Sequence, residues 1–186
     1  MTPEEAAAAL LDKAGLSTLD APPIDVLHLA EEIEHLDVQE HADLMAVEGA
    51  PALAPGTVLS GLLLPAERRV WVNALEAQRS PGRRRFTIAH ELGHWRLHCD
   101  GADPHTRFCR SDEVGAGEAE AAAAQEIERE ANRFAAALLM PERLVREEAP
   151  KHRLNVKVLA DRFGVSVVAM QVRLEGLRLM PDYMKR

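Results

Sequence analysis

The feature that most constrains this chain is an H-E-x-x-H pattern at residues 90–94, within the segment FTIAHELGHWRLH. Residues four apart stack on one face of a helix, about one turn from each other. Two imidazoles at this spacing, His90 and His94, can hold one zinc ion while Glu91 stands beside it as a general base. Apolar residues between and before the histidines suit a buried active-site helix. The segment therefore predicts a helix that carries a catalytic zinc site.

A catalytic zinc ion usually takes three protein ligands and leaves a fourth position for water. His98 continues the spacing of four, but the eight residues from His90 raise it by about 12 Å along the helix. Zinc bonds are only about 2 Å long, so His98 is too far from His90 to bind the same ion. It is predicted to be structural or to contact one of the zinc ligands. The longer pattern H-E-x-x-H-x-x-G-x-x-H is disfavoured, because Leu97 and Asp100 occupy its glycine and histidine positions.

A second, alanine-rich helix is expected at residues 118–140, ending at Pro141, and could supply the third ligand. At about 100° per residue its large apolar residues form one stripe, and Glu128 falls within about 60° of the stripe centre. Glu130 falls about 100° away, which makes Glu128 the preferred ligand and Glu130 the alternative. Asn132 lies one turn after Glu128 and is predicted to orient its carboxylate.

Three stretches together resemble the ImmA/IrrE family of zinc metallopeptidases. They are FTIAHELGH followed by LH, then EREANRFAAALLMP, then LADRFGVS. The resemblance extends over residues 24–179 and implies that His90, His94 and Glu128 bind zinc and that Glu91 is the catalytic base. It also implies site-specific cleavage of a helix-turn-helix transcriptional repressor. The native metal is left open between Zn²⁺ and Mn²⁺.

The expected fold class is α+β, zincin-like. It comprises a small β-sheet in the N-terminal half, two zinc-bearing helices and a C-terminal segment that resembles a helix-turn-helix. We expect a metallopeptidase domain at residues 1–148 and a helical subdomain at 149–186 packed on it. A chain of 186 residues is long enough for this core.

Composition is that of an ordinary soluble protein, with 47% hydrophobic and 28% charged residues. No stretch has the length of a membrane span and the start has no basic signal-peptide region, so a cytoplasmic location without membrane contact is expected. Two cysteines, Cys99 and Cys109, are too few for a disulfide scaffold and are expected to be free thiols. A Cys/His metal site with His105 is a weaker alternative, because the spacing fits no common zinc motif.

Short strands are expected at residues 38–41, 44–47, 58–64 and 69–73, after helices beginning at Thr2 and near Asp25. The last strand could form an edge to which an extended substrate adds, or it could be internal with Trp71 in the core. The segment SPGRRR is predicted as a turn, and residues 101–117 as a long polar loop bordering the cleft.

The C-terminal residues 156–177 predict helix, turn, helix, with Gly164 in the turn and Ser166 as N-cap. The net charge is −8, yet residues 143–186 hold 10 basic and 5 acidic residues, which keeps a DNA contact open. Against DNA binding, the second helix offers only Gln171 and Arg173 as base readers. A packing role is preferred. The alternative function is a repressor- or DNA-binding regulatory module with conditional or no proteolysis.

In the expected mechanism, Glu91 takes a proton from water and passes it to the leaving amine. A second donor must stabilise the oxyanion. His105, Arg107 and His152 are candidates, and Tyr183 is a weaker one. The sequence does not identify the substrate or the oligomeric state.

Overall fold

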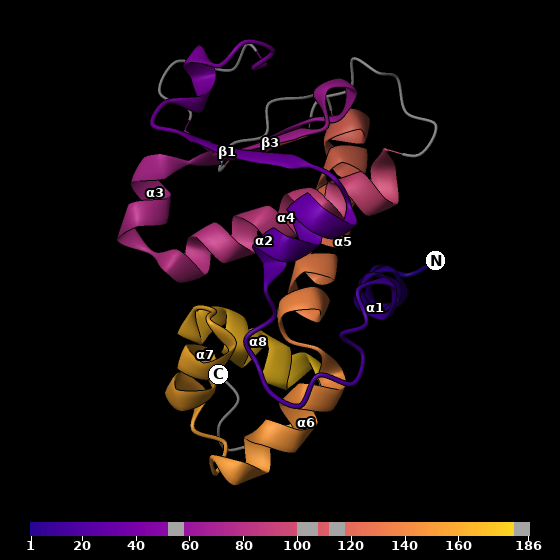
Figure 1. Cartoon of the computed structure of the whole chain (residues 1–186), viewed down its shortest axis with the longest axis vertical. Coiled ribbons are helices and arrows are strands. Elements are labelled where there is room, and N and C mark those ends of the chain that lie inside the picture. Colours follow the sequence, from indigo (N-terminus) through magenta and orange to yellow (C-terminus); the bar gives the residue numbers. More distant parts are fainter. Residues whose placement is uncertain (52–57, 100–107, 112–117, 181–186) are drawn as a thin grey trace.

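The computed structural model describes residues 1–51, 58–99, 108–111 and 118–180. It is α+β, with a small sheet and two long helices, and a further group of helices lies at the opposite end from the sheet (Figure 1). This confirms the α+β expectation. None of the helices in these ranges is long and apolar enough to cross a membrane.

The N-terminal helices are short and well capped. Helix α1 (Pro3–Lys13) begins with a capping box, in which the Thr2 side chain accepts from the Glu5 amide and the Glu5 side chain accepts from the Thr2 amide. Helix α2 (Val26–His28) continues into a π-helical turn, η1 (Leu29–Ile33), so the expected helix near Asp25 is present.

Four strands form one sheet in the order β1-β3-β2-β4, with bounds β1 (Asp37–His41), β2 (Leu59–Leu64), β3 (Arg69–Asn73) and β4 (Phe108–Ser111). Strand β3 pairs with β1 in parallel and with β2 antiparallel. The edge position proposed for β3 is therefore wrong, because both of its hydrogen-bonding sides are occupied. Trp71 is partly buried and packs on a small second apolar cluster that includes Leu62 and Leu64.

Three local predictions fail. Residues 44–46 form a 3-10 helix (η2, Leu44–Ala46), because the Asp43 side chain accepts from the Met45 amide and starts a turn. The expected turn SPGRRR is mostly helical, since Ser80 caps helix α4 (Pro81–His98) with Pro81 in its first turn. The expected loop 101–117 contains β4, and its remainder lies outside the described residues.

The connecting helices bring the chain from the sheet to the C-terminal group. The remaining elements are η3 (Pro65–Glu67), α3 (Ala74–Arg79), α5 (Glu118–Leu139), α6 (Glu142–Lys151), α7 (Val156–Phe163) and α8 (Val167–Gly176). Pro150 lies inside α6, near its C-terminal end. Gly164 at φ +64° and the N-cap Ser166 join α7 to α8 as predicted.

One large apolar core joins α1, the lower face of the sheet, α4, α5 and the C-terminal helices. Ile88 and Leu92 of α4 and Phe134 and Leu138 of α5 are fully buried within it. Gly93 permits the close approach of the two long helices, since a Cβ there would lie 3.0 Å from Ala131 Cα. The core thus fixes α4 against α5. The division into domains at residues 148 and 149 stays a prediction.

Candidate metal centre

The centre of the molecule is the contact between α4 and α5, which lies below the sheet in Figure 1. Residues from Thr87 to His94 of α4 are all buried, although this segment includes two histidines and a glutamate. Buried polar side chains of this kind require partners, because burial removes their hydrogen bonds to water.

Three of the predicted site residues meet at this contact. His90 Nε2 and His94 Nε2 lie 3.0 Å apart. His90 Nε2 is 3.1 Å from one oxygen of Glu128, and His94 Nε2 is 3.1 Å from the other. Both histidines are fully buried, whereas the Glu128 side chain retains 32% exposure. Among the described residues, these three form a group with the spacing to hold a metal ion.

The charge states suit metal binding. Burial lowers the pKa of His94 to about 4, so its imidazole is neutral at pH 7. Desolvation raises the pKa of the Glu128 carboxyl, but contacts with the two imidazoles outweigh it and bring the pKa to about 2. Neutral imidazole and ionised carboxylate are the forms that ligate zinc.

The outer nitrogen of each histidine has its own partner. His90 Nδ1 lies 3.2 Å from Asn132 Oδ1, and His94 Nδ1 lies 3.2 Å from His98 Nδ1. His98 Nε2 in turn lies 3.0 Å from Glu130 Oε2. Asn132 therefore supports His90, and its predicted role beside Glu128 is wrong. His98 contacts His94, one of the predicted ligands, and Glu130 contacts His98 in turn.

These outer contacts decide where the imidazole protons lie. An amide oxygen and a carboxylate only accept, so His90 Nδ1 donates to Asn132 and His98 Nε2 donates to Glu130. His98 Nδ1 can then accept from His94 Nδ1, which lies 3.2 Å away. With both Nδ1 atoms donating outward, the two Nε2 atoms can bind a metal ion beside the Glu128 carboxylate, in place of the contacts they make with it in this structure. A cation among them would satisfy all three groups.

The spacing also fits. Ligand atoms with bonds of about 2.0–2.2 Å around a tetrahedral zinc lie about 3.3–3.6 Å apart. The observed separations of 3.0 and 3.1 Å are only a few tenths of an ångström shorter. The donor set of two nitrogens and one carboxylate matches that of catalytic zinc sites.

Glu91 is fully buried on α4 and faces the sheet. Strand β2 passes so near that a Cβ at Gly61 would lie 2.4 Å from Glu91 Oε1 and 2.6 Å from Thr87 Cγ2. Glycine at position 61 thus leaves the space that the carboxylate occupies. No sequence pattern marks Gly61, because its approach to Glu91 joins segments that are distant in the chain.

Among the described residues, Cys99 and His152 are not part of this group. Burial raises the pKa of the Cys99 thiol to about 12, with Glu91 adding to the effect, so the thiol is protonated at neutral pH. His152 Nε2 lies 3.3 Å from Glu148 Oε2 on α6. His105, Arg107 and Tyr183 lie outside the described residues, as does the Cys109 side chain.

The family model Peptidase_M78, described as the IrrE N-terminal-like domain, matches residues 63–175. This interval contains the whole α4–α5 contact, helix α7 and all but the last residue of α8. No curated protein matches the chain significantly.

Proposed function

Because the chain belongs to the Peptidase_M78 family, the IrrE N-terminal-like metallopeptidases, we propose that it is a zinc-dependent endopeptidase with a zincin-like arrangement. Family membership agrees with the resemblance drawn from the sequence. The observation that carries the proposal is the convergence of His90, His94 and Glu128 with Glu91 one residue from the first ligand. Nitrogen-rich sites favour zinc over manganese, which prefers oxygen ligands.

In this proposal His90, His94 and Glu128 hold the zinc ion. When bound, zinc supplies a Lewis acid for the scissile carbonyl and lowers the pKa of a water molecule. Glu91 accepts the proton of the attacking water and delivers it to the leaving amine nitrogen. Asn132 and His98 keep the two imidazoles oriented, since each accepts the Nδ1 hydrogen of its partner. The buried position of Glu91 restricts access of other water to this carboxylate.

The substrate we propose is a helix-turn-helix transcriptional repressor, as the resemblance to ImmA/IrrE proteins implies. The alternative is a regulatory module that binds a repressor or DNA without cleavage. A binding module has no chemical need for a base beside a metal site, which favours the enzyme.

DNA binding through α8 is disfavoured by its side-chain contacts. Gln171 Nε2 donates to Glu175 Oε1 at 3.0 Å, and Arg173 Nε donates to the Met140 carbonyl at 3.0 Å. Gln171 is thus engaged within the protein, and the half-buried Arg173 is held through its Nε at the end of α5. The residues that α8 exposes most are Val168 and Val172, which cannot read base edges by hydrogen bonding.

The test mixes the zinc-loaded protein with the helix-turn-helix regulator encoded beside it and follows both by intact-mass spectrometry. Wild-type protein should cleave the regulator at one bond, and Glu91→Gln should bind zinc but not cleave. Glu126→Gln, an exposed carboxylate on α5, is the matched control and should cleave normally. A stable complex with full zinc occupancy and no cleavage would favour the binding module instead.

A further inference from the structure

Helix α8 presents an apolar surface that the core does not use. Val168 and Val172, one turn apart, are 71% and 63% exposed, and Val167 is 45% exposed. The opposite face of the same helix is fully buried through Met170 and Leu174. Large aliphatic side chains clustered on an exposed face are typical of binding surfaces.

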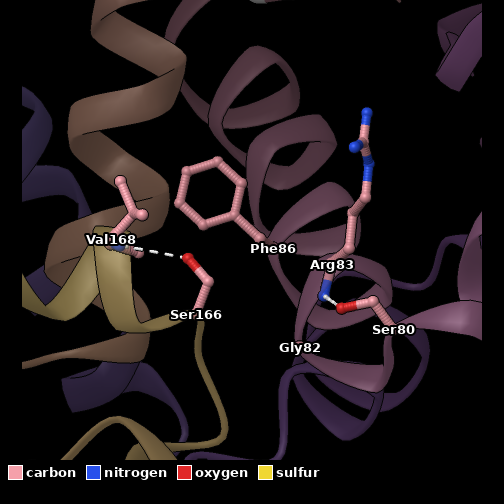
Figure 2. Close-up of a pocket in the computed structure, with 7 residues that line it drawn as sticks. Ser80, Gly82, Arg83, Phe86, Ser166 and Val168 are labelled. Carbon is pink, nitrogen blue, oxygen red and sulfur yellow. Dashed lines mark hydrogen bonds between the residues drawn. The ribbon is translucent and has the colours of Figure 1, made fainter. Parts of the chain in front are cut away.

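Two neighbouring cavities lie along this helix. The first, of about 520 Å³, lies between the start of α4 and the start of α8, with Phe86 and Val168 facing each other across it (Figure 2). The second, of about 490 Å³, lies between α5 and α8 and is lined by Ala136, Met140 and Val172. Both include Phe86 and Ala169, so they form one furrow, which we call the α8 furrow.

Arg173 gives this furrow a charge. It lines the second cavity, and burial lowers its pKa, with Glu142 and Glu4 acting in the opposite direction. Within the described part of the chain no carboxylate oxygen lies within 4.0 Å of its guanidinium nitrogens. The other arginine of the same cavity, Arg133, makes two bonds to the Glu4 carboxylate instead. A half-buried guanidinium beside aliphatic side chains matches a ligand carboxylate flanked by apolar groups.

One residue that lines the furrow also contacts the metal centre. Phe86 precedes His90 by one turn of α4, and Asn132, which also lines the furrow, accepts the hydrogen bond of His90 Nδ1. The furrow and the metal centre thus share helices α4 and α5, and the His90 imidazole lies between Asn132 and the Glu128 carboxylate.

We propose that the α8 furrow binds a segment of the polypeptide substrate in which an acidic residue is flanked by aliphatic ones. The aliphatic side chains pack on Val168, Val172 and Phe86, and the carboxylate pairs with Arg173. This inference rests on the proposed function, because it assigns the furrow to the substrate of the metal centre. The C-terminal helices then select the substrate, while α4 and α5 cleave it.

The test uses the zinc-loaded Glu91→Gln protein, which cannot consume its ligand, and a phage-displayed library of random 12-residue peptides. Selected peptides should carry Asp or Glu beside Leu, Ile, Val or Phe. The double change Val168→Ser and Val172→Ser should abolish the enrichment. Arg173→Gln should keep the apolar preference and lose the acidic one, and a selected peptide should bind it about 10-fold more weakly. Val158→Ser removes an exposed valine of α7 outside the furrow and is the matched control.

Three results would overturn the proposal. The first is equal enrichment of peptides on the double valine variant, and the second is selection of basic peptides. The third is a wild-type dimer in sedimentation velocity that the double valine change abolishes, because that result would assign the furrow to a second copy of the chain. The proposed function fails separately. If the expected peptides are selected but the wild type cleaves nothing, the furrow proposal stands and the peptidase proposal falls. If the wild type cleaves but no acidic-aliphatic peptides are selected, only the furrow proposal falls. Thermal unfolding of the double variant should match wild type, because both valines are exposed.

Discussion

Replacing His98 with alanine should lower the zinc affinity about 10-fold, at the lower end of the range of about 10- to 100-fold for residues behind a ligand. The change removes the acceptor 3.2 Å from His94 Nδ1. A buried donor left without an acceptor costs about 1–3 kcal/mol, and about 1.4 kcal/mol corresponds to a tenfold change. The lower end is expected because His98 is 11% exposed, so water can enter the space and accept in its place.

The assay is competition for zinc between the metal-free protein and a chromophoric chelator, with Co²⁺ absorption as a second report on the ligand environment. His98→Gln offers an amide oxygen to His94 and should recover part of the affinity. Glu130→Gln should cost less than His98→Ala, because Glu130 is 39% exposed and contacts His94 only through His98. Glu126→Gln is the surface control.

The reasoning is refuted if His98→Ala binds zinc as tightly as wild type while His94→Ala loses the metal. Glu128→Ala should weaken binding more than Glu130→Ala does. The reverse order would move the third ligand to Glu130.

Three further substitutions test the surrounding structure. Gly61→Ala should reduce peptidase activity at least 10-fold with unchanged zinc content, since its Cβ would lie 2.4 Å from Glu91 Oε1; a fully active variant would show that the carboxylate tolerates displacement. Gly93→Ala should lower the free energy of unfolding by about 1–3 kcal/mol through overpacking against Ala131. Gly176→Ala is its control, since a Cβ there meets nothing within 4 Å, and equal unfolding curves for the two would contradict the prediction. Glu148→Gln should cost about 1.5–3 kcal/mol at pH 7. The bond from Lys151 and the contact with Arg162 hold the pKa of Glu148 below its ordinary 4.5 despite burial. The stabilisation by ionised Glu148 is therefore complete above pH 4.5 and is lost as the pH falls through the lowered pKa. A difference in stability between wild type and Glu148→Gln that persists unchanged at pH 2 would count against this ion pairing.

Local chemistry made the group of His90, His94 and Glu128 predictable. The spacing of His90 and His94 places them on one helical face, and the apolar stripe of α5 selects Glu128 over Glu130. The cap at Thr2 and the turn at Gly164 were likewise predictable, because each depends on a few consecutive residues.

Features that depend on distant segments were not predictable. Whether β3 is an edge strand depends on where β1 and β2 pair, and its flanking sequence does not carry that information. The partner of Asn132 depends on how α5 is rotated against α4, so a periodicity argument placed it beside the nearest carboxylate instead of His90. The approach of Gly61 to Glu91 has the same origin.

Peptide hydrolysis by this protein should depend on the metal ion and require Glu91. The most direct measurement incubates a proteome-derived peptide library with zinc-loaded wild type or Glu91→Gln and identifies new N-termini by mass spectrometry. New N-termini should appear with wild type alone, disappear when a chelator removes the metal, and return with added zinc. The same N-termini from both proteins, or none from the zinc-loaded wild type, would contradict the account.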